Sequence, residues 1–171
     1  MTSRLICSVA ALFLYSGAMS CLAQMSTPQY GVKESEAPTG SNIKRYVASG
    51  SRIPVNRTYA ELSADEKAFV SSFYEKMGPG DEPPFPIEGL RPIYSAIAKV
   101  QQKLLVTGKL TLVASVDPTG TVTEVQVIES PSKAMTQAAA SVVVLAKFKP
   151  ALCANQPCKM EFPFNFAFAV R

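Results

Sequence analysis

Few residues of this chain could do chemistry. Its 171 residues include no histidine, which excludes Ser-His-Asp and Cys-His nucleophile systems, histidine metal ligands and histidine proton relays. Within residues 109–129 the carboxylates are Asp117, which fits a turn, and Glu124 and Glu129, which fit solvated strand positions. They do not form an acid–base pair, and the sequence has no glycine-rich phosphate loop. The sequence therefore predicts no catalytic residues and no cofactor.

Two cysteines near the C-terminus, Cys153 and Cys158, are the remaining reactive candidates. A metal site needs more ligands than two thiolates, and none lie nearby in the sequence, so no metal site is expected. A redox-active pair usually has two intervening residues, whereas this pair is more widely spaced. In an oxidising compartment the two cysteines are expected to close a structural disulfide.

Residues 1–24 are typical of an export signal. Arg4 precedes a mostly apolar stretch, and small residues follow it at two candidate cleavage sites. Two alternatives stay open: residues 5–23 could remain as an inner-membrane anchor, and Cys21 could be lipidated. All three outcomes place the rest of the chain outside the cytoplasm.

The composition of the remaining chain indicates a folded domain behind a tether. The net charge of +4 is too small for a nucleic-acid reader, and the hydrophobic content of 47% is enough for a packed core. Residues 25–57 are rich in Ser, Thr, Pro and Gly and show no period, so they are expected to be a flexible tether.

Residues 58–89 are expected to form a helical extension. Ser63 and Glu66 have the spacing of a capping box, and an apolar face follows at helical spacing. Gly78 and Pro79 are expected to end this helix. The aromatic side chains of that face are expected to be buried against the domain that follows, with a docking helix for a partner as the functional alternative.

Residues 90–171 have the pattern of a compact α+β unit. In order, the pattern predicts a helix from Pro92 to Gly108, a strand over 109–116, a turn over 117–120, a β-branched strand over 121–129, and a helix capped at Ser130 and Pro131. The side of the last helix that faces the sheet is expected to carry Met135, Ala138, Ala139, Val142, Leu145 and Ala146. Val122 and Val125 fall on opposite faces of their strand, which indicates a bulge or burial on both faces.

The clearest strand is the last one. Apolar side chains at even positions from Met160 to Val170, four of them phenylalanines, alternate with the residues between them. A slip of one residue would turn every phenylalanine outward, so the register is strongly specified. Pro163 has no N–H for a ladder and belongs on an edge strand or at a bulge. Such an edge could accept a partner's strand, or Pro163 could only block aggregation there.

The order and spacing of these segments resemble the C-terminal domain of TonB-type energy transducers, over about residues 90–171. The segments that carry the resemblance are Gly108 to Leu112, Asp117 to Gly120, Val125 to Ser130, Ala138 to Ala140 with the following Phe148-Lys149-Pro150-Ala151, and Phe162-Pro163-Phe164-Asn165-Phe166. The resemblance implies a periplasmic domain with a small antiparallel three-stranded sheet and helices packed on one face.

The resemblance also implies a partner and a contact strand. In the family, an extended segment of an outer-membrane transporter pairs with the exposed edge of the last strand. Carried onto this chain, the contact strand is 159–170, and the side chains expected to contact the partner are Lys159, Glu161, Asn165 and Ala167. A strand-paired homodimer is a second possibility for such an edge, and no nucleic-acid partner is expected.

The chain departs from a full transducer in two respects. It has no histidine for a motor-coupled anchor and no long proline-rich spacer. A periplasmic adaptor, an inhibitor or an envelope scaffold that uses the same fold therefore stays open beside a role in TonB-dependent transport.

Overall fold

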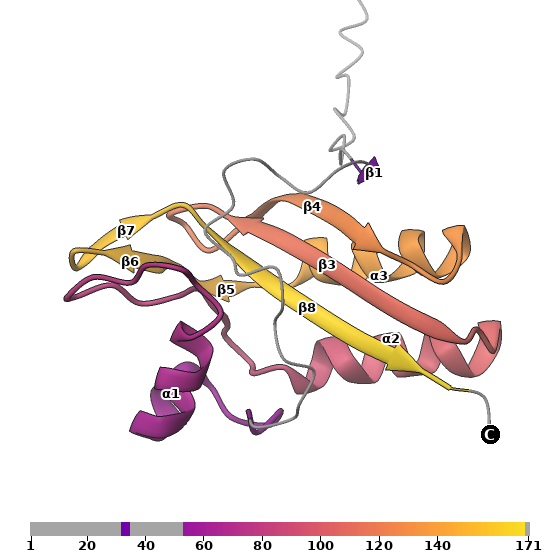
Figure 1. Cartoon of the computed structure of the whole chain (residues 1–171), viewed down its shortest axis with the longest axis horizontal. Helices are drawn as coiled ribbons and strands as arrows, with labels where there is room; N and C mark the ends of the chain where they lie inside the picture. The colour runs from indigo at the N-terminus through magenta and orange to yellow at the C-terminus, as the bar shows by residue number, and fades with distance from the viewer. Residues whose placement is uncertain (1–31, 35–52, 170–171) are drawn as a thin grey trace, which may run out of the picture.

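The computed structural model describes residues 32–34 and 53–169 (Figure 1). The expected export signal, Cys21 and most of the expected tether lie outside the described residues. The helices are η1 (Tyr59–Glu61), α1 (Ala64–Ser71), α2 (Arg91–Leu104) and α3 (Lys133–Leu145). The strands are β1 (Val32–Glu34), β2 (Phe85–Pro86), β3 (Gly108–Val116), β4 (Val122–Glu129), β5 (Phe148–Lys149), β6 (Ala151–Cys153), β7 (Gln156–Cys158) and β8 (Met160–Phe168).

The main sheet has the strand order β1-β4-β3-β8. The central strand β3 pairs antiparallel with β4 on one side and with β8 on the other, while β1 adds a parallel strand along β4. Helices α2 and α3 lie behind this sheet, on the same face (Figure 1). The predicted α+β fold with a three-stranded antiparallel sheet and helices on one face is therefore confirmed.

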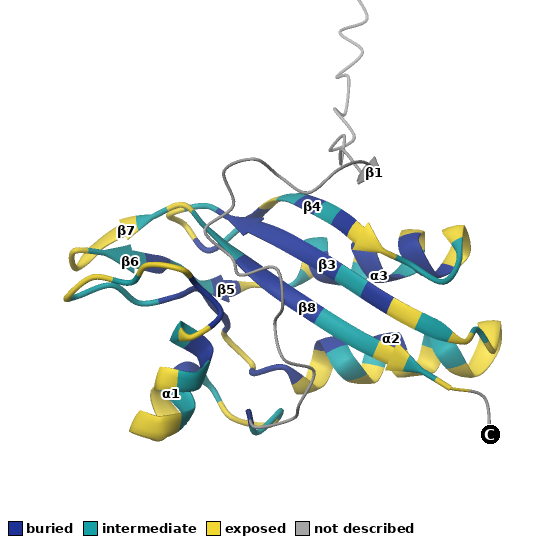
Figure 2. Ribbon diagram, in the orientation of Figure 1, coloured by how far each residue is buried: buried dark blue, intermediate teal, exposed yellow. Residues whose placement is uncertain are grey.

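The alternation of β8 determines its place in the core. Phe162 and Phe164 are fully buried, and their rings meet edge-to-face at a centroid distance of 5.0 Å. Phe166 and Phe168 continue the same side of the strand and are half-buried (Figure 2). Each fully buried phenylalanine contributes about 1.5–3 kcal/mol by leaving water, so β8 is a main stabiliser of the sheet.

The β3–β4 hairpin has the predicted turn and the predicted irregularity. The Asp117 carboxylate accepts hydrogen bonds from the main-chain N–H groups of Thr119 and Thr121, at 2.8 and 3.0 Å. The pairing register shifts twice along the hairpin. Because of these shifts Val122 and Val125 are both buried, although strict alternation would put them on opposite faces.

Helix α1 ends earlier than predicted. It has the expected capping box at Ser63 and Glu66, but it stops at Ser71 instead of continuing to Gly78. After Ser71 the main-chain bonds tighten to the i→i−3 pattern, with Phe73 N donating to the Val70 carbonyl and Tyr74 N to the Ser71 carbonyl. The Tyr74 side chain reaches β8 from this turn, so a tertiary contact accompanies the early end of the helix.

Helix α3 differs from its prediction in its start and in its buried face. Its cap is Ser132, whose hydroxyl accepts from Met135 N at 3.2 Å, and not Ser130. The buried face consists of Met135, Thr136, Ala139, Ala140 and Val143. Leu145, predicted to face inward, is 76% exposed. A helix rich in alanine and valine has little contrast between its sides, so its sequence does not determine which side the sheet covers.

Residues 53–90, which contain the predicted extension 58–89 and are called the extension from here on, share one core with the sheet and its helices. Phe85 is 0% exposed, and its ring lies 5.8 Å from the ring of Tyr59 and 5.8 Å from that of Phe162 in β8. Val70 and Phe73, from α1 and the turn after it, belong to the same hydrophobic cluster. The aromatic face of the extension is therefore core packing, and the extension and the sheet stabilise each other.

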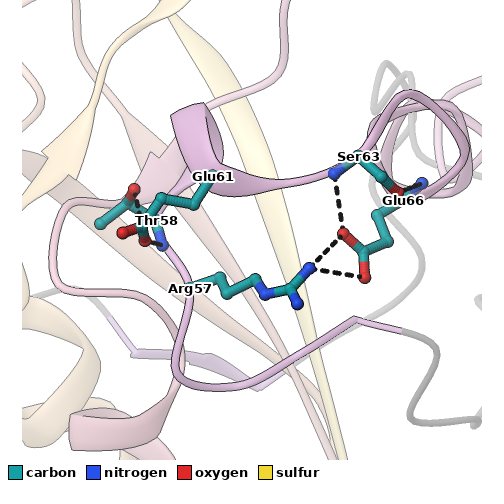
Figure 3. Close-up of polar contacts among 5 residues, drawn as sticks. All are labelled: Arg57, Thr58, Glu61, Ser63 and Glu66. Carbon is teal, nitrogen blue, oxygen red and sulfur yellow. Dashed lines mark hydrogen bonds and ion pairs between the residues drawn. The ribbon is translucent and has the colours of Figure 1, made fainter.

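Polar contacts fix the start of this segment (Figure 3). The Glu61 carboxylate accepts from the Thr58 N–H at 2.8 Å, and the Glu66 carboxylate accepts from the Ser63 N–H at 2.8 Å. Arg57 lies 3.3 Å from the Glu66 carboxylate and joins the two turns. Two successive capping boxes thus satisfy the N–H groups at the starts of η1 and α1.

A disulfide-closed hairpin, β6–β7, anchors the middle of the extension. The predicted disulfide between Cys153 and Cys158 is present. The Asp81 carboxylate accepts from the N–H groups of Ala154 and Gly78, each at 2.7 Å. Main-chain bonds between Glu82 and Leu152, in both directions, complete this contact.

Acidification is expected to weaken the Asp81 anchor. The hydrogen bonds from Ala154 and then Gly78 hold the pKa of Asp81 below its usual value. A carboxyl group with a lowered folded-state pKa stabilises the fold above its unfolded-state pKa, and this contribution disappears as the pH falls through the folded-state pKa. In urea unfolding, Asp81→Asn should be less stable than the wild type in neutral buffer, and the difference should shrink progressively as the pH falls below about 4. A stability difference that stays constant with pH would contradict this account.

Candidate functional site

The side of β8 that β3 does not pair, here called the free edge, is the candidate site. Within the described residues, β8 has β3 as its only neighbour in the sheet. At the opposite side of the sheet, β4 is paired with β1 over Val125 to Val127. An edge strand presents unpaired main-chain groups that can accept another strand. The prediction that Pro163 belongs on an edge strand is confirmed.

Pro163 shows which residues direct their main-chain groups to the free edge. Successive residues of an antiparallel strand alternate between bonding one neighbour and facing away from it. Pro163 lies opposite Val113 in a ladder that continues on both sides of it. Because proline has no N–H to donate, its nitrogen must face away from β3. Two residues earlier, the Glu161 carbonyl accepts from the Tyr74 hydroxyl at 2.7 Å, beyond the ladder. Residues 161, 163, 165 and 167 therefore face the free edge.

The structure places three of the four predicted contact residues in one row on β8, namely Glu161, Asn165 and Ala167, while Lys159 lies just before the strand. Lys159 and Ala167 are exposed, whereas Glu161 and Asn165 are half-buried. Pro163, which interrupts the row, is buried. The role of these side chains in binding remains a prediction.

Asn165 is fixed by its cross-strand neighbour. The Thr111 hydroxyl donates to Asn165 Oδ1 at 3.1 Å. This bond uses Oδ1, and the other terminal atom of the same amide, Nδ2, is a hydrogen-bond donor. On the opposite face of β8, the ring of Phe166 packs edge-to-face on that of Tyr94 in α2, at 5.0 Å. The end of β8 thus has a polar outer face and an aromatic inner face.

Tyr74 is the residue that the sequence analysis missed at this site. It is 3% exposed, and burial, with smaller contributions from Glu161 and Tyr59, raises its pKa far above the usual value for a tyrosine. Its hydroxyl therefore stays protonated and remains a donor to Glu161 in neutral solution. The phenylalanines and tyrosines of the extension resemble core residues in the sequence, and nothing local distinguishes the one that reaches β8.

Residues 91–168 match the family described as Gram-negative bacterial TonB protein C-terminal. Residues 91–168 form a TonB C-terminal domain. Comparison with curated proteins and with solved structures gives no match. The family comprises periplasmic, non-catalytic protein-interaction domains, and its match covers less than half of this chain.

The TonB C-terminal domain ends with β8, so the free edge lies within the matched residues. Tyr74 and the rest of 53–90 precede the match, yet they contact β8 directly. This protein therefore combines the family's last strand with an additional segment that packs beside it.

A second concave surface lies away from β8. A groove of about 260 Å³ runs between β2, the start of α2 and the end of α3, and Ile87, Gly89, Pro92, Val142, Leu145 and Lys147 are among its lining residues. The sequence analysis missed this groove because it placed Leu145 in the core.

Over 32–34 and 53–169, no group of three or more Cys, Asp or Glu residues could hold a metal ion. In this same part of the chain, no helix has the length and apolar character needed to cross a bilayer.

Proposed function

We propose that this protein is a periplasmic binding module that adds an extended segment of a TonB-dependent outer-membrane transporter as a strand along β8. The observation that carries the proposal is the unpaired edge of β8 within a TonB C-terminal domain. In strand addition, main-chain hydrogen bonds supply affinity and neighbouring side chains supply selectivity. Each such bond contributes about 0.5–1.5 kcal/mol net, so a short segment binds reversibly.

An adaptor, inhibitor or envelope-scaffold role is the second candidate. The observation that favours it is the extension 53–90, which precedes the family match and packs into the same core. In this alternative the free edge still binds an extended segment, but the segment belongs to another envelope protein. The partner recovered on β8 distinguishes the two candidates.

Replacing Asn165 by proline is expected to abolish strand addition without unfolding the domain. The N–H of residue 165 faces the free edge, so its loss removes a donor to the partner and no bond to β3. Binding to outer-membrane vesicles from the native host, measured by co-sedimentation, should weaken by about ten-fold or more. The urea unfolding free energy should stay within about 1 kcal/mol of that of the matched control.

The matched control is Asn165→Ala, which removes the same side chain but keeps the N–H. It should bind the vesicles more tightly than Asn165→Pro. Equal binding by the two variants would show that the main chain at residue 165 takes no part. Unfolding of Asn165→Pro alone would show that this N–H bonds within the sheet, which contradicts the assignment of the free edge.

A further inference from the structure

We propose that Tyr74 closes the first half of the free edge, so that a partner strand pairs only with residues 163–168. The inference rests on the proposed function and specifies which part of β8 an added strand can pair with. The extension 53–90, which the family match does not cover, then limits how much of β8 a partner strand can pair with.

Tyr74 occupies the free edge at Glu161. Its hydroxyl donates to the Glu161 carbonyl at 2.7 Å, on the side of β8 away from β3. A strand added at Glu161 would need this position for its own N–H. The side chain of Tyr74 is almost completely buried, so it is packed in place and not resting on the surface.

Main-chain and aromatic contacts hold Tyr74 in this position. The early end of α1 and the turn bond from Tyr74 N to the Ser71 carbonyl, at 3.1 Å, bring this residue off the helix. The edge-to-face contact of Phe85 with Phe162 fixes the extension to the same end of β8. In Figure 1, α1 lies on the opposite side of β8 from β3, as this arrangement requires.

The main-chain groups that remain for a partner strand lie in the second half of the free edge. Pro163 has no N–H, so after Glu161 the next donor on the free edge is the N–H of Asn165. The remaining edge groups of β8 are the Pro163 carbonyl and both groups of Asn165 and Ala167. A partner strand can therefore pair with β8 only along residues 163–168.

The side chains beside these groups define the partner's chemistry. On the outer face lie the amide of Asn165 and the exposed Lys109, which is directly opposite the small Ala167. On the inner face, Phe166 and Phe168 are half-buried. The edge therefore fits an extended segment with a hydrogen-bond-accepting or acidic side chain on one face and an apolar one on the other.

Photo-crosslinking in the native host tests this limit. Full-length chains carrying p-benzoylphenylalanine at position 161, 165 or 167 are irradiated in cells, and the products are identified by mass spectrometry. Transporter crosslinks are expected at positions 165 and 167, with a yield at least about ten-fold lower at 161. Comparable yields at all three positions would overturn the inference and leave the proposed function intact. The absence of transporter crosslinks at every position would overturn the proposed function itself.

A pair of tyrosine variants tests the cause of the limit. Tyr74→Ala should raise the yield at position 161 toward that at 165. Tyr59→Ala is the matched control, because it removes another buried tyrosine of the extension, whose ring packs on Phe85. An equal rise in both variants would assign the effect to general loosening and would contradict the role of Tyr74. Should Tyr74→Ala fail to fold, the yields in the otherwise wild-type chain still decide the inference.

Discussion

Phe85→Ala is expected to lower the free energy of unfolding by about 3–5 kcal/mol, the range for a fully buried phenylalanine. Phe85 is 0% exposed and lies between Tyr59 of the extension and Phe162 of β8. Its removal leaves a cavity between two parts of the chain that are distant in sequence. Because the total stability of a domain is about 5–15 kcal/mol, this loss is a large fraction of it.

Urea denaturation followed by circular dichroism measures this effect, with the disulfide kept oxidised. The control is Ile87→Ala, two residues further along the chain at a side chain that is 50% exposed, and its cost should be below about 1 kcal/mol. Similar costs for the two variants would mean that the extension does not share the core of the TonB C-terminal domain.

Gly120→Ala is expected to cost about 2–5 kcal/mol, from an unfavourable backbone conformation and from overpacking. Gly120 has φ +81°, in the left-handed region, and a Cβ atom there would lie 2.0 Å from the Phe148 carbonyl oxygen. The atom in the way belongs to the main chain of β5, so no side-chain rotation can relieve the contact. The turn or β5 would have to move, and with β5 its pairing to β2.

Thermal unfolding compares this variant with Gly78→Ala. At Gly78 the nearest atom to an added Cβ is Asp81 Oδ2, at 3.3 Å, and that side chain can adjust. The midpoint of Gly78→Ala should stay close to that of the wild type, whereas that of Gly120→Ala should fall clearly. Equal midpoints would show that the turn after Asp117 accommodates a side chain.

The sequence predicted the elements whose pattern is local. The alternation of β8 depends on a period of two residues, and the Asp117–Gly120 turn depends on residues within that turn, so both were found correctly. The predictions for the end of α1 and for the buried face of α3 were wrong, because tertiary contacts decide both features. Tyr74 leaves its helix to reach β8, and the sheet selects one side of a helix whose sides are similar in sequence.

The same distinction holds for the candidate site. Pro163 predicted an edge strand because a missing N–H restricts a residue wherever the chain places it. The contact of Tyr74 with Glu161 joins residues far apart in sequence, and no spacing rule connects them. The groove beside Leu145 was missed for a related reason, since it depends on how α3 is rotated against the sheet.

The burial of β8 changes along its length, and this gradient affects its dynamics. Its phenylalanines pass from full burial at Phe162 and Phe164 to half burial at Phe166 and Phe168 (Figure 2). Segments with fewer buried contacts open locally at lower free energy than the global unfolding. The end of β8 that offers the free edge should therefore fray most readily, and its amides should exchange hydrogen fastest within the strand. A partner strand bound there would order this end and extend the order of the rigid half of β8. Binding and local folding would then be thermodynamically coupled.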